Sequence, residues 1–404
     1  MIKIGLRHNL WYPFLFVIFT IFRRIVKYIE EKTVLNNNKK IKTSFLMISF
    51  MILLELILSS IYSCIKNDNI ETNSNKTSNN NGIYKLKLIG QKRELIIPDN
   101  SIKIAFLIFF SAYFEIFGFI TRRFITFTDK NDDYDEFNAK FRSIEILCSS
   151  LLCYFTLRIE ILKHQIFSLI IILLSLIILF ILEFYHENAS NNKYKKNILL
   201  VISTSISRAF LDTSEKYLFE VDYINIFKLV RLQEIINVIL MSLYYINEEP
   251  RYQIIDLIDY GKENKLRVFF AVILILIYAI LTAYKNLYRR LTVKEYSPMT
   301  RALAESFLDP FLILYGFFEK NFEDKEKNKE LTYYIINLIL ELIMVFFGCV
   351  YNELFVLYCC GLQHNTHLEV AKRAENIEIL MLHEKEEIND VNDEIDSDKD
   401  DNNK

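Results

Sequence analysis

The side chains of this sequence that could do chemistry are charged groups inside long apolar segments. On membrane-insertion scales each such charge costs about 2.5–3.5 kcal/mol, so it normally faces a partner or a water-filled cavity. Ten of them are the candidate binding residues: Arg208, Asp212, Glu215, Lys216, Lys228, Arg231, Glu234, Arg301, Glu305 and Asp309. Their number and their mixed signs indicate a polar interior.

The spacing of these residues predicts three helical stripes, each of which holds both signs of charge. The stripes consist of Arg208, Asp212 and Glu215, of Lys228, Arg231 and Glu234, and of Arg301, Glu305 and Asp309. Residues three, four or seven positions apart share one face of a helix. Pro310 ends the third stripe, where it breaks the helix and can free backbone carbonyls. We expect the three stripes to converge on one cavity.

An alternative is that the charges serve structure alone, by pairing with one another and fixing the register of the helices. Long basic side chains near helix ends can also extend to the lipid headgroups. We expect that interfacial position for Arg122, Arg123, Arg289 and Arg290.

Three single acids, Glu55, Glu115 and Glu341, each interrupt a long apolar segment. A carboxyl in such a segment is either protonated and hydrogen-bonded across helices or part of a proton path. We favour the structural role for all three.

No constellation for catalysis is found in the sequence, which lacks the H-E-x-x-H, G-x-S-x-G, Walker A and G-x-G-x-x-G patterns. His364 and His367 are three residues apart, but no cysteine or carboxylate completes a metal site with them. The 6 cysteines lie in or beside apolar segments and are expected to be small buried hydrophobes. The vicinal pair Cys359 and Cys360 leaves lipidation open. We expect no enzyme activity, no cofactor and no metal site.

The elements that must position the charged residues are blocks of about twenty apolar residues separated by short polar stretches. A helix needs about 20 apolar residues to cross the hydrocarbon core, and backbone in lipid must form its hydrogen bonds internally. Ten spans are expected, near residues 10–29, 45–65, 102–122, 143–161, 166–185, 198–218, 226–246, 266–285, 298–318 and 333–354. The predicted fold is an all-α polytopic membrane bundle that covers residues 1–362.

Three other parts of the chain have compositions unlike those of the spans. Residues 66–101 contain an Asn/Ser/Thr tract with too little apolar surface to fold, so a disordered loop is expected there. Residues 363–383 mix apolar and charged residues at helical spacing, which is typical of an interfacial amphipathic helix. Residues 384–404 are strongly acidic and are expected to form a solvated, disordered tail.

The charge distribution excludes one class of partner and leaves the sidedness open. A formal net charge of −2 on 404 residues argues against nucleic-acid binding. Lysines and arginines are comparably frequent on the two sides of the predicted bundle, so they do not set its orientation. The glycosylation patterns at Asn75 and Asn188 are separated by three spans, so at most one of them can be modified.

The segment 214–218, Ser-Glu-Lys-Tyr-Leu, is followed about fifteen residues later by Gln233 and Glu234 in the next span. This arrangement resembles the "E-K-(aromatic)…E-G" signature of the solute carrier 35 branch of the drug/metabolite transporter superfamily, although Ile235 stands where the signature has glycine. The resemblance implies two five-helix inverted repeats around a central site, alternating access, and organic anions such as nucleotide sugars as substrates. It matches Glu215, Lys216 and Glu234 to the signature.

These observations favour secondary-active or exchange transport of a small organic anion across an internal membrane, such as the Golgi, endoplasmic reticulum or vacuole. Lys216, Lys228 or Arg231 would attract the solute. Asp212, Glu215 or Glu234 would pair with those cations when the site is vacant. The expected partners are the lipid bilayer and the solute, and a homodimer is left open. The alternative is a non-transporting multispan scaffold or receptor whose acidic tail binds a partner.

Overall fold

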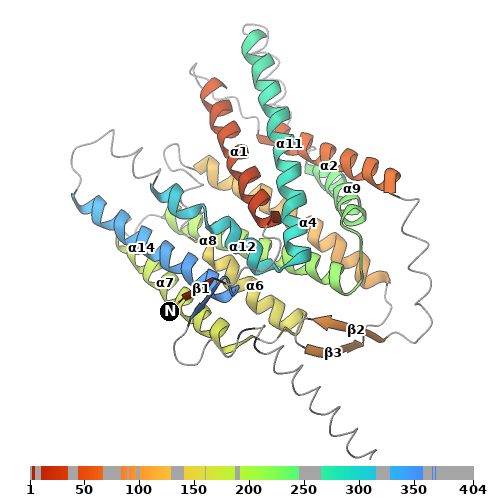
Figure 1. The fold of residues 1–404 in the computed structure, drawn as a ribbon. Helices are drawn as coiled ribbons and strands as arrows, with labels where there is room; N and C mark the ends of the chain where they lie inside the picture. The colour runs from red at the N-terminus through yellow and green to blue at the C-terminus, as the bar shows by residue number, and fades with distance from the viewer. Residues whose placement is uncertain are drawn as a thin grey trace, which may run out of the picture.

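A computed structural model of the chain describes residues 2–4, 11–34, 44–66, 83–88, 91–96, 101–128, 141–159, 161–186, 192–244, 265–314, 328–357, 366 and 369. The described part is mainly helical (Figure 1). Its helices are α1 (Trp11–Val34), α2 (Ser44–Lys66), α4 (Ser101–Thr128), α6 (Ser143–Thr156), α7 (Lys163–His186), α8 (Asn192–Glu220), α9 (Ile226–Tyr244), α11 (Lys265–Glu295), α12 (Pro298–Ser306) and α14 (Asn328–Tyr351). Each of the ten predicted segments overlaps one of these helices, in the same order.

Several helix ends differ from the prediction, and those of α6, α11 and α12 bear on the charged residues. Helix α6 ends at Thr156, and Arg158 then adopts a left-handed φ of 51°. Helix α11 continues ten residues beyond the predicted end at position 285. Helix α12 starts with the Ser297 hydroxyl accepting a hydrogen bond from the Thr300 N–H, and it stops at Ser306. Helical residues resume only at 309–314, where Pro310 lies in the first turn and needs no backbone partner there.

Within the described ranges, three helices are long and apolar enough to cross a membrane. They are Lys163–Tyr185 in α7, Val268–Glu295 in α11 and Thr332–Tyr351 in α14. Two shorter apolar helices, Ile48–Tyr62 and Ser143–Thr156, accompany them. These helices fit a protein that associates with a membrane.

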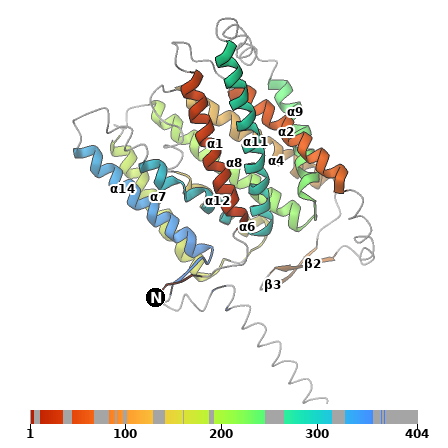
Figure 2. The same cartoon turned by 45° about the horizontal axis from the view of Figure 1, so that its top comes forward.

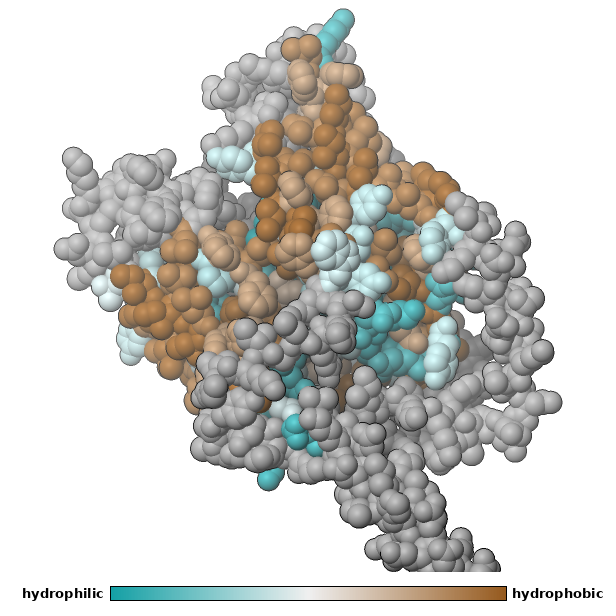
Figure 3. All heavy atoms as spheres, in the orientation of Figure 1, coloured by the Kyte–Doolittle hydropathy of each residue, from teal (hydrophilic) through white to brown (hydrophobic). Residues whose placement is uncertain are grey.

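Among the described residues, hydrophobic side chains are exposed and charged side chains are buried. In a soluble protein, charged residues are almost never fully buried. Hydrophobic side chains cover much of the face seen in Figure 3. Large exposed apolar side chains occur on many helices, for example Phe14, Leu53, Phe106, Leu151, Leu174, Ile239, Phe270 and Ile339. Charged side chains, by contrast, are buried in the interior, and three arginines are among the largest fully buried residues: Arg142, Arg290 and Arg301.

The helices pack as a bundle in which neighbours along the chain are seldom the closest neighbours in space (Figures 1 and 2). Helix α1 lies along α11, α4 along α8, α2 along α9, and α7 along α14. Helix α8 also contacts α6, α11 and α12, and α6 contacts α12. Because α8 contacts four other helices through its length, its polar stripe faces several elements at once.

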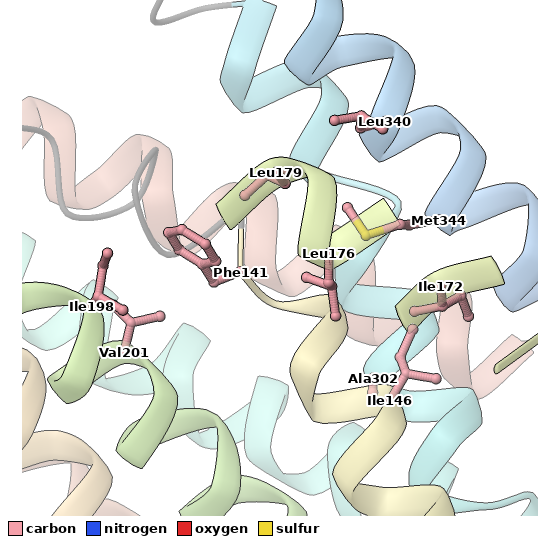
Figure 4. Packing of buried hydrophobic residues seen from close by; sticks show 10 residues of the cluster. All are labelled: Phe141, Ile146, Ile172, Leu176, Leu179, Ile198, Val201, Ala302, Leu340 and Met344. Carbon is pink, nitrogen blue, oxygen red and sulfur yellow. The ribbon is translucent and has the colours of Figure 1, made fainter. Parts of the chain in front are cut away.

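The largest apolar core joins α6, α7, α8, α12 and α14. Its buried members are Phe141, Ile146, Ile172, Leu176, Leu179, Ile198, Val201, Ala302, Leu340 and Met344 (Figure 4). Gly348 allows α14 to approach α12 closely, because a Cβ at that position would lie 2.6 Å from the Leu303 Cδ1 atom. This core fixes α12, which carries one of the predicted charged stripes.

Two small antiparallel sheets complete the described fold. Strands β2 (Ile83–Leu88) and β3 (Gln91–Ile96) form a hairpin with a two-residue connection, and β1 (Ile2–Ile4) pairs with β4 (Phe355–Leu357). The hairpin lies within the loop that was expected to lack regular structure. The alternation in Ile-Tyr-Lys-Leu-Lys-Leu at 83–88 and the glycine at position 90 explain it.

Several sequence predictions fall outside the described residues. They are the Asn-rich tract, the acceptor sites Asn75 and Asn188, the pair His364 and His367, most of the expected interfacial helix at 363–383, and the tail at 384–404.

Candidate functional site

A continuous network of buried ion pairs occupies the interior of the bundle. In the part of the chain that the structure describes, it joins eight carboxylates to six basic side chains. The carboxylates are Glu55, Glu115, Glu145, Asp212, Glu215, Glu234, Glu305 and Asp309. The basic side chains are Arg142, Arg208, Lys285, Arg289, Arg290 and Arg301. None of these side chains is more than 12% exposed.

We call the first half of the network the Arg301 cluster. Arg301 on α12 pairs with Glu145 on α6, and its Nε donates to the Asp212 Oδ2 atom of α8 over 2.5 Å. One turn further along α12, the Glu305 Oε2 atom lies 3.1 Å from the Arg301 Nη1 atom. The guanidinium therefore joins three helices through three carboxylates.

Three further cations surround Glu305 and complete the Arg301 cluster. The Arg142 Nη1 atom donates to the Glu305 backbone carbonyl over 3.1 Å and lies 3.1 Å from the Asp309 Oδ1 atom. The Lys285 Nζ atom lies 3.4 Å from the Glu305 Oε1 atom. Arg208 is more loosely held, because its Nη1 atom is 3.9 Å from Glu305 and 3.8 Å from the nearest oxygen of Glu145.

We call the second half the Arg290 cluster. The Arg290 guanidinium on α11 contacts one carboxylate from each of four elements. Its nitrogens lie 3.0 Å from the nearest oxygen of Glu55 on α2, 3.1 Å from Glu115 on α4, 3.3 Å from Glu215 on α8 and 3.5 Å from Glu234 on α9. One cation thus holds four buried acids together.

Neutral amides support the Arg290 cluster. The Asn286 Nδ2 atom donates to the Glu55 Oε1 atom over 2.7 Å. The Gln233 Nε2 atom donates to the Glu215 Oε1 atom over 3.2 Å and to the Ser111 hydroxyl over 2.8 Å. These donors satisfy part of the hydrogen-bonding capacity of the carboxylates, as buried ions require.

Arg289 connects the two clusters. It pairs with Asp212 of the Arg301 cluster, and its Nη2 atom donates to the Glu215 Oε1 atom of the Arg290 cluster over 2.8 Å. Asp212 and Glu215 lie three residues apart on α8 and so face the same side of that helix.

A cavity that is partly open to the surroundings adjoins the Arg301 cluster and Arg289. Its lining comprises Arg23, Phe114, Glu115, Gly118, Arg208, Leu211, Asp212, Lys285, Asn286, Arg289, Arg301 and Glu305. Five of these side chains are basic and three are acidic, so the wall carries a formal charge of +2. Fixed cations beside a cavity favour an anionic occupant.

Seven of the ten predicted site residues belong to the network: Arg208, Asp212, Glu215, Glu234, Arg301, Glu305 and Asp309. The remaining three are basic, and the structure does not bring them there. Lys228 is exposed and Arg231 is partly exposed. The Lys216 Nζ atom donates to the backbone carbonyls of Lys294 and Tyr296 over 2.8 and 3.0 Å, and it lies 2.7 Å from Glu220.

Arg289 and Arg290, which were expected at the membrane interface, are instead 6% and 1% exposed inside the bundle. The reason for the correction is the length of α11, which continues to Glu295 and so places both residues within the helix. Glu55 and Glu115 form hydrogen bonds across helices, as expected, and the bonds are to charged Arg290.

Sequence reasoning overlooked Arg142, Glu145 and Lys285. Two spacings would have indicated them: Lys285 precedes Arg289 by four residues, and Arg142 precedes Glu145 by three. Each pair lies on one helical face next to an apolar block.

No protein-family model matches this chain, and no curated protein matches it at a significant level.

Proposed function

We propose that this chain is a multispan membrane transporter that moves a small organic anion by alternating access. The observation that carries the proposal is the cavity beside the Arg301 cluster, whose wall presents five basic and three acidic side chains. Buried charge in a membrane helix normally faces a partner or a solute pathway. Here the cations exceed the acids along the wall, so an anion would complete the balance of charge.

The contacts between helices support two related halves, one from α1 to α7 and the other from α8 to α14. In this comparison, α1 corresponds to α8, α2 to α9, α4 to α11, α6 to α12 and α7 to α14. The α1–α11 contact then corresponds to the α8–α4 contact, and α2–α11 corresponds to α9–α4. Likewise, α6–α8 corresponds to α12–α1, and α6–α7 corresponds to α12–α14. Each of the contacts α2–α9, α6–α12 and α7–α14 joins a helix to its own counterpart in the other half. Contacts among α8, α11 and α12 have no counterpart of similar extent in the first half.

This pattern is what an internal two-fold axis produces. If every helix of a half crosses the bilayer, five crossings reverse the orientation of the second half, which gives an inverted repeat. The resemblance of Glu215, Lys216 and Glu234 to the drug/metabolite transporter signature implies the same arrangement. In that arrangement the solute site lies between the halves. The cavity wall here contains residues of both halves, and Arg23, Glu115 and Gly118 belong to the first.

Arg208 and Lys285 are the cations best suited to take the solute. Among the described residues, their ion-pair carboxylate oxygens lie 3.8 and 3.4 Å away, whereas the Arg301 and Arg289 guanidinium groups each donate to two or more acids at shorter range. A solute carboxylate or phosphate that pairs with Arg208 and Lys285 would release Glu305 to Arg142 and Arg301. Such an exchange of ion-pair partners would couple binding to movement of α12 against α8 and α11.

The test is counterflow uptake by purified protein in proteoliposomes, with nucleotide sugars, nucleotides, amino acids and small cations as the panel. Arg208→Gln removes a cation of the cavity wall, and Arg231→Gln is the matched control on the partly exposed face of α9. We expect saturable uptake of an anion, a rise in KM of tenfold or more for Arg208→Gln, and an unchanged KM for Arg231→Gln. Equal kinetics in both variants would refute the cavity as the solute site.

The scaffold alternative is decided by the same experiment. If folded protein takes up no solute from the panel, the buried charges have a structural role, and the next measurement is capture of partners by the acidic segment 384–404.

A further inference from the structure

The Arg290 cluster contains more negative charge than its cations balance. Among the described residues, Glu55, Glu115 and Glu234 form ion pairs only with Arg290, while Glu215 also has Arg289. Three carboxylates against one guanidinium leave a formal charge of −2. Uncompensated charge in a buried site is costly, so a positively charged ligand would be bound strongly there.

The geometry of the three acids fits a metal ion. One carboxylate oxygen from each of Glu55, Glu115 and Glu234 lies within 4.8 Å of the other two. Oxygen ligands of Mg²⁺, Ca²⁺ and Mn²⁺ lie roughly 2.0–2.6 Å from the ion, so ligands on opposite sides of it are about 4–5 Å apart. Small side-chain movements would bring all three acids into bonding range.

Acceptor atoms without donors provide a second, independent indication. Asn237 is 1% exposed, and its Nδ2 atom donates to Glu115 over 3.4 Å and to Glu234 over 3.3 Å. Among the described residues, its Oδ1 atom, on the same planar amide, has no hydrogen-bond partner, and neither does the Gln233 Oε1 atom. Every unsatisfied atom here is an oxygen acceptor, and a bound cation would satisfy such oxygens.

Two cavities reach the cluster. The cavity beside the Arg301 cluster also touches Glu115 and Asn286. A second one touches Glu55, Ser59 and Arg290 between α2, α9 and α11. A small ion therefore has a polar approach along Glu115 that does not require the helices to separate.

We propose that Glu55, Glu115 and Glu234 bind one divalent cation of the class that prefers oxygen ligands, namely Mg²⁺, Ca²⁺ or Mn²⁺, with the Asn237 carbonyl oxygen beside it. Its charge equals the formal excess of the cluster. The three ligands come from α2, α4 and α9, so the ion would join helices of both halves of the chain. The site does not depend on the proposed transport, because binding is measured without a solute.

The first measurement is electron paramagnetic resonance of Mn²⁺ titrated into the full-length protein in detergent, with Mg²⁺ and Ca²⁺ as competitors. We expect one Mn²⁺ per chain, at least tenfold weaker binding in Glu234→Gln and in Glu55→Gln, and unchanged binding in Glu341→Gln. Glu341 is the matched control, a fully buried acid on α14 outside the cluster. No Mn²⁺ binding by the wild type, or equal binding by all four proteins, would overturn the proposal.

Thermal unfolding separates a metal site from simple protonation. Glu234→Gln removes excess negative charge, so this variant should unfold at a higher temperature than the metal-free wild type. Mn²⁺ should raise the unfolding temperature of the wild type and not that of the variant. A wild-type unfolding temperature that changes with pH but not with Mn²⁺ would show that protons balance the cluster, and it would overturn the metal site.

Discussion

The Arg301 and Arg290 clusters are built from the same kinds of side chain and differ in the ratio of their charges. In the Arg301 cluster, Glu145, Asp212 and Glu305 each have a second basic partner besides Arg301. In the Arg290 cluster, three of the four acids have Arg290 as their single ion-pair partner within the described part of the chain. The first cluster borders a cavity with cations in excess, and the second holds acids in excess.

This difference shows how one buried network can provide two kinds of site. Removal of one member of a buried ion pair is costly because its partner stays charged and unpaired, so the cost depends on how many alternative partners remain. The Arg301 cluster should therefore tolerate loss of its central arginine and exchange partners, while the Arg290 cluster should not tolerate loss of Arg290. Removal of single charged side chains from each cluster tests this contrast.

Arg290→Ala should be the most damaging change. It leaves Glu55, Glu115 and Glu234 without an ion-pair partner among the described residues, and loss of about 3–5 kcal/mol of stability is typical for a broken buried pair. The measurement is the yield of monodisperse protein and its unfolding temperature in detergent. Arg290→Lys keeps the charge and should recover part of the lost stability. If Arg290→Ala is as stable as the wild type, the proposed difference between the two clusters is wrong.

Arg301→Ala should cost less, about 1.5–3 kcal/mol, the range for a hydrogen bond to a charged group. Asp212 keeps Arg289, Glu145 keeps Arg208, and Glu305 keeps the cations around it. The same unfolding experiment, run beside Arg290→Ala, gives the comparison. If Arg301→Ala is the more damaging of the two, the number of remaining partners does not control the cost.

Lys216→Met should lower stability by about 1 kcal/mol, since it removes hydrogen bonds to two backbone carbonyls at the end of α11 and the contact with Glu220. Lys216 lies outside both clusters, so the KM of any transported anion should stay at the wild-type value. The checks are thermal unfolding and proteoliposome uptake. A large rise in KM without loss of stability would return Lys216 to the solute site.

Lys228→Gln should have the smallest effect, within about 0.5 kcal/mol, because this side chain is exposed on α9 and belongs to neither cluster. Unfolding temperature and uptake should both match the wild type. A clear loss of either would mean that the network extends to residues that the packing leaves outside it.

The local pattern of the sequence was sufficient to predict the helices. Blocks of apolar residues placed ten segments where ten helices are found in the described chain, and the i, i+4, i+7 spacing of Arg208, Asp212 and Glu215 put them on one face of α8. Helical periodicity depends only on the chain itself, which is why this part of the prediction could be made.

The partners of each charged residue were decided by tertiary structure. The sequence shows that Glu55, Glu115 and Glu234 lie within apolar segments, but these segments are far apart in sequence. The three acids meet around Arg290 only because α2 and α8 pack against α11, while α4 packs against α8 and α9 packs against α2. Lys216 follows Glu215 in the sequence, but its side chain binds a backbone carbonyl at the end of α11 and does not join the network. Neighbouring residues on a helix point in different directions, so which of them enters the network depends on the helices that surround α8.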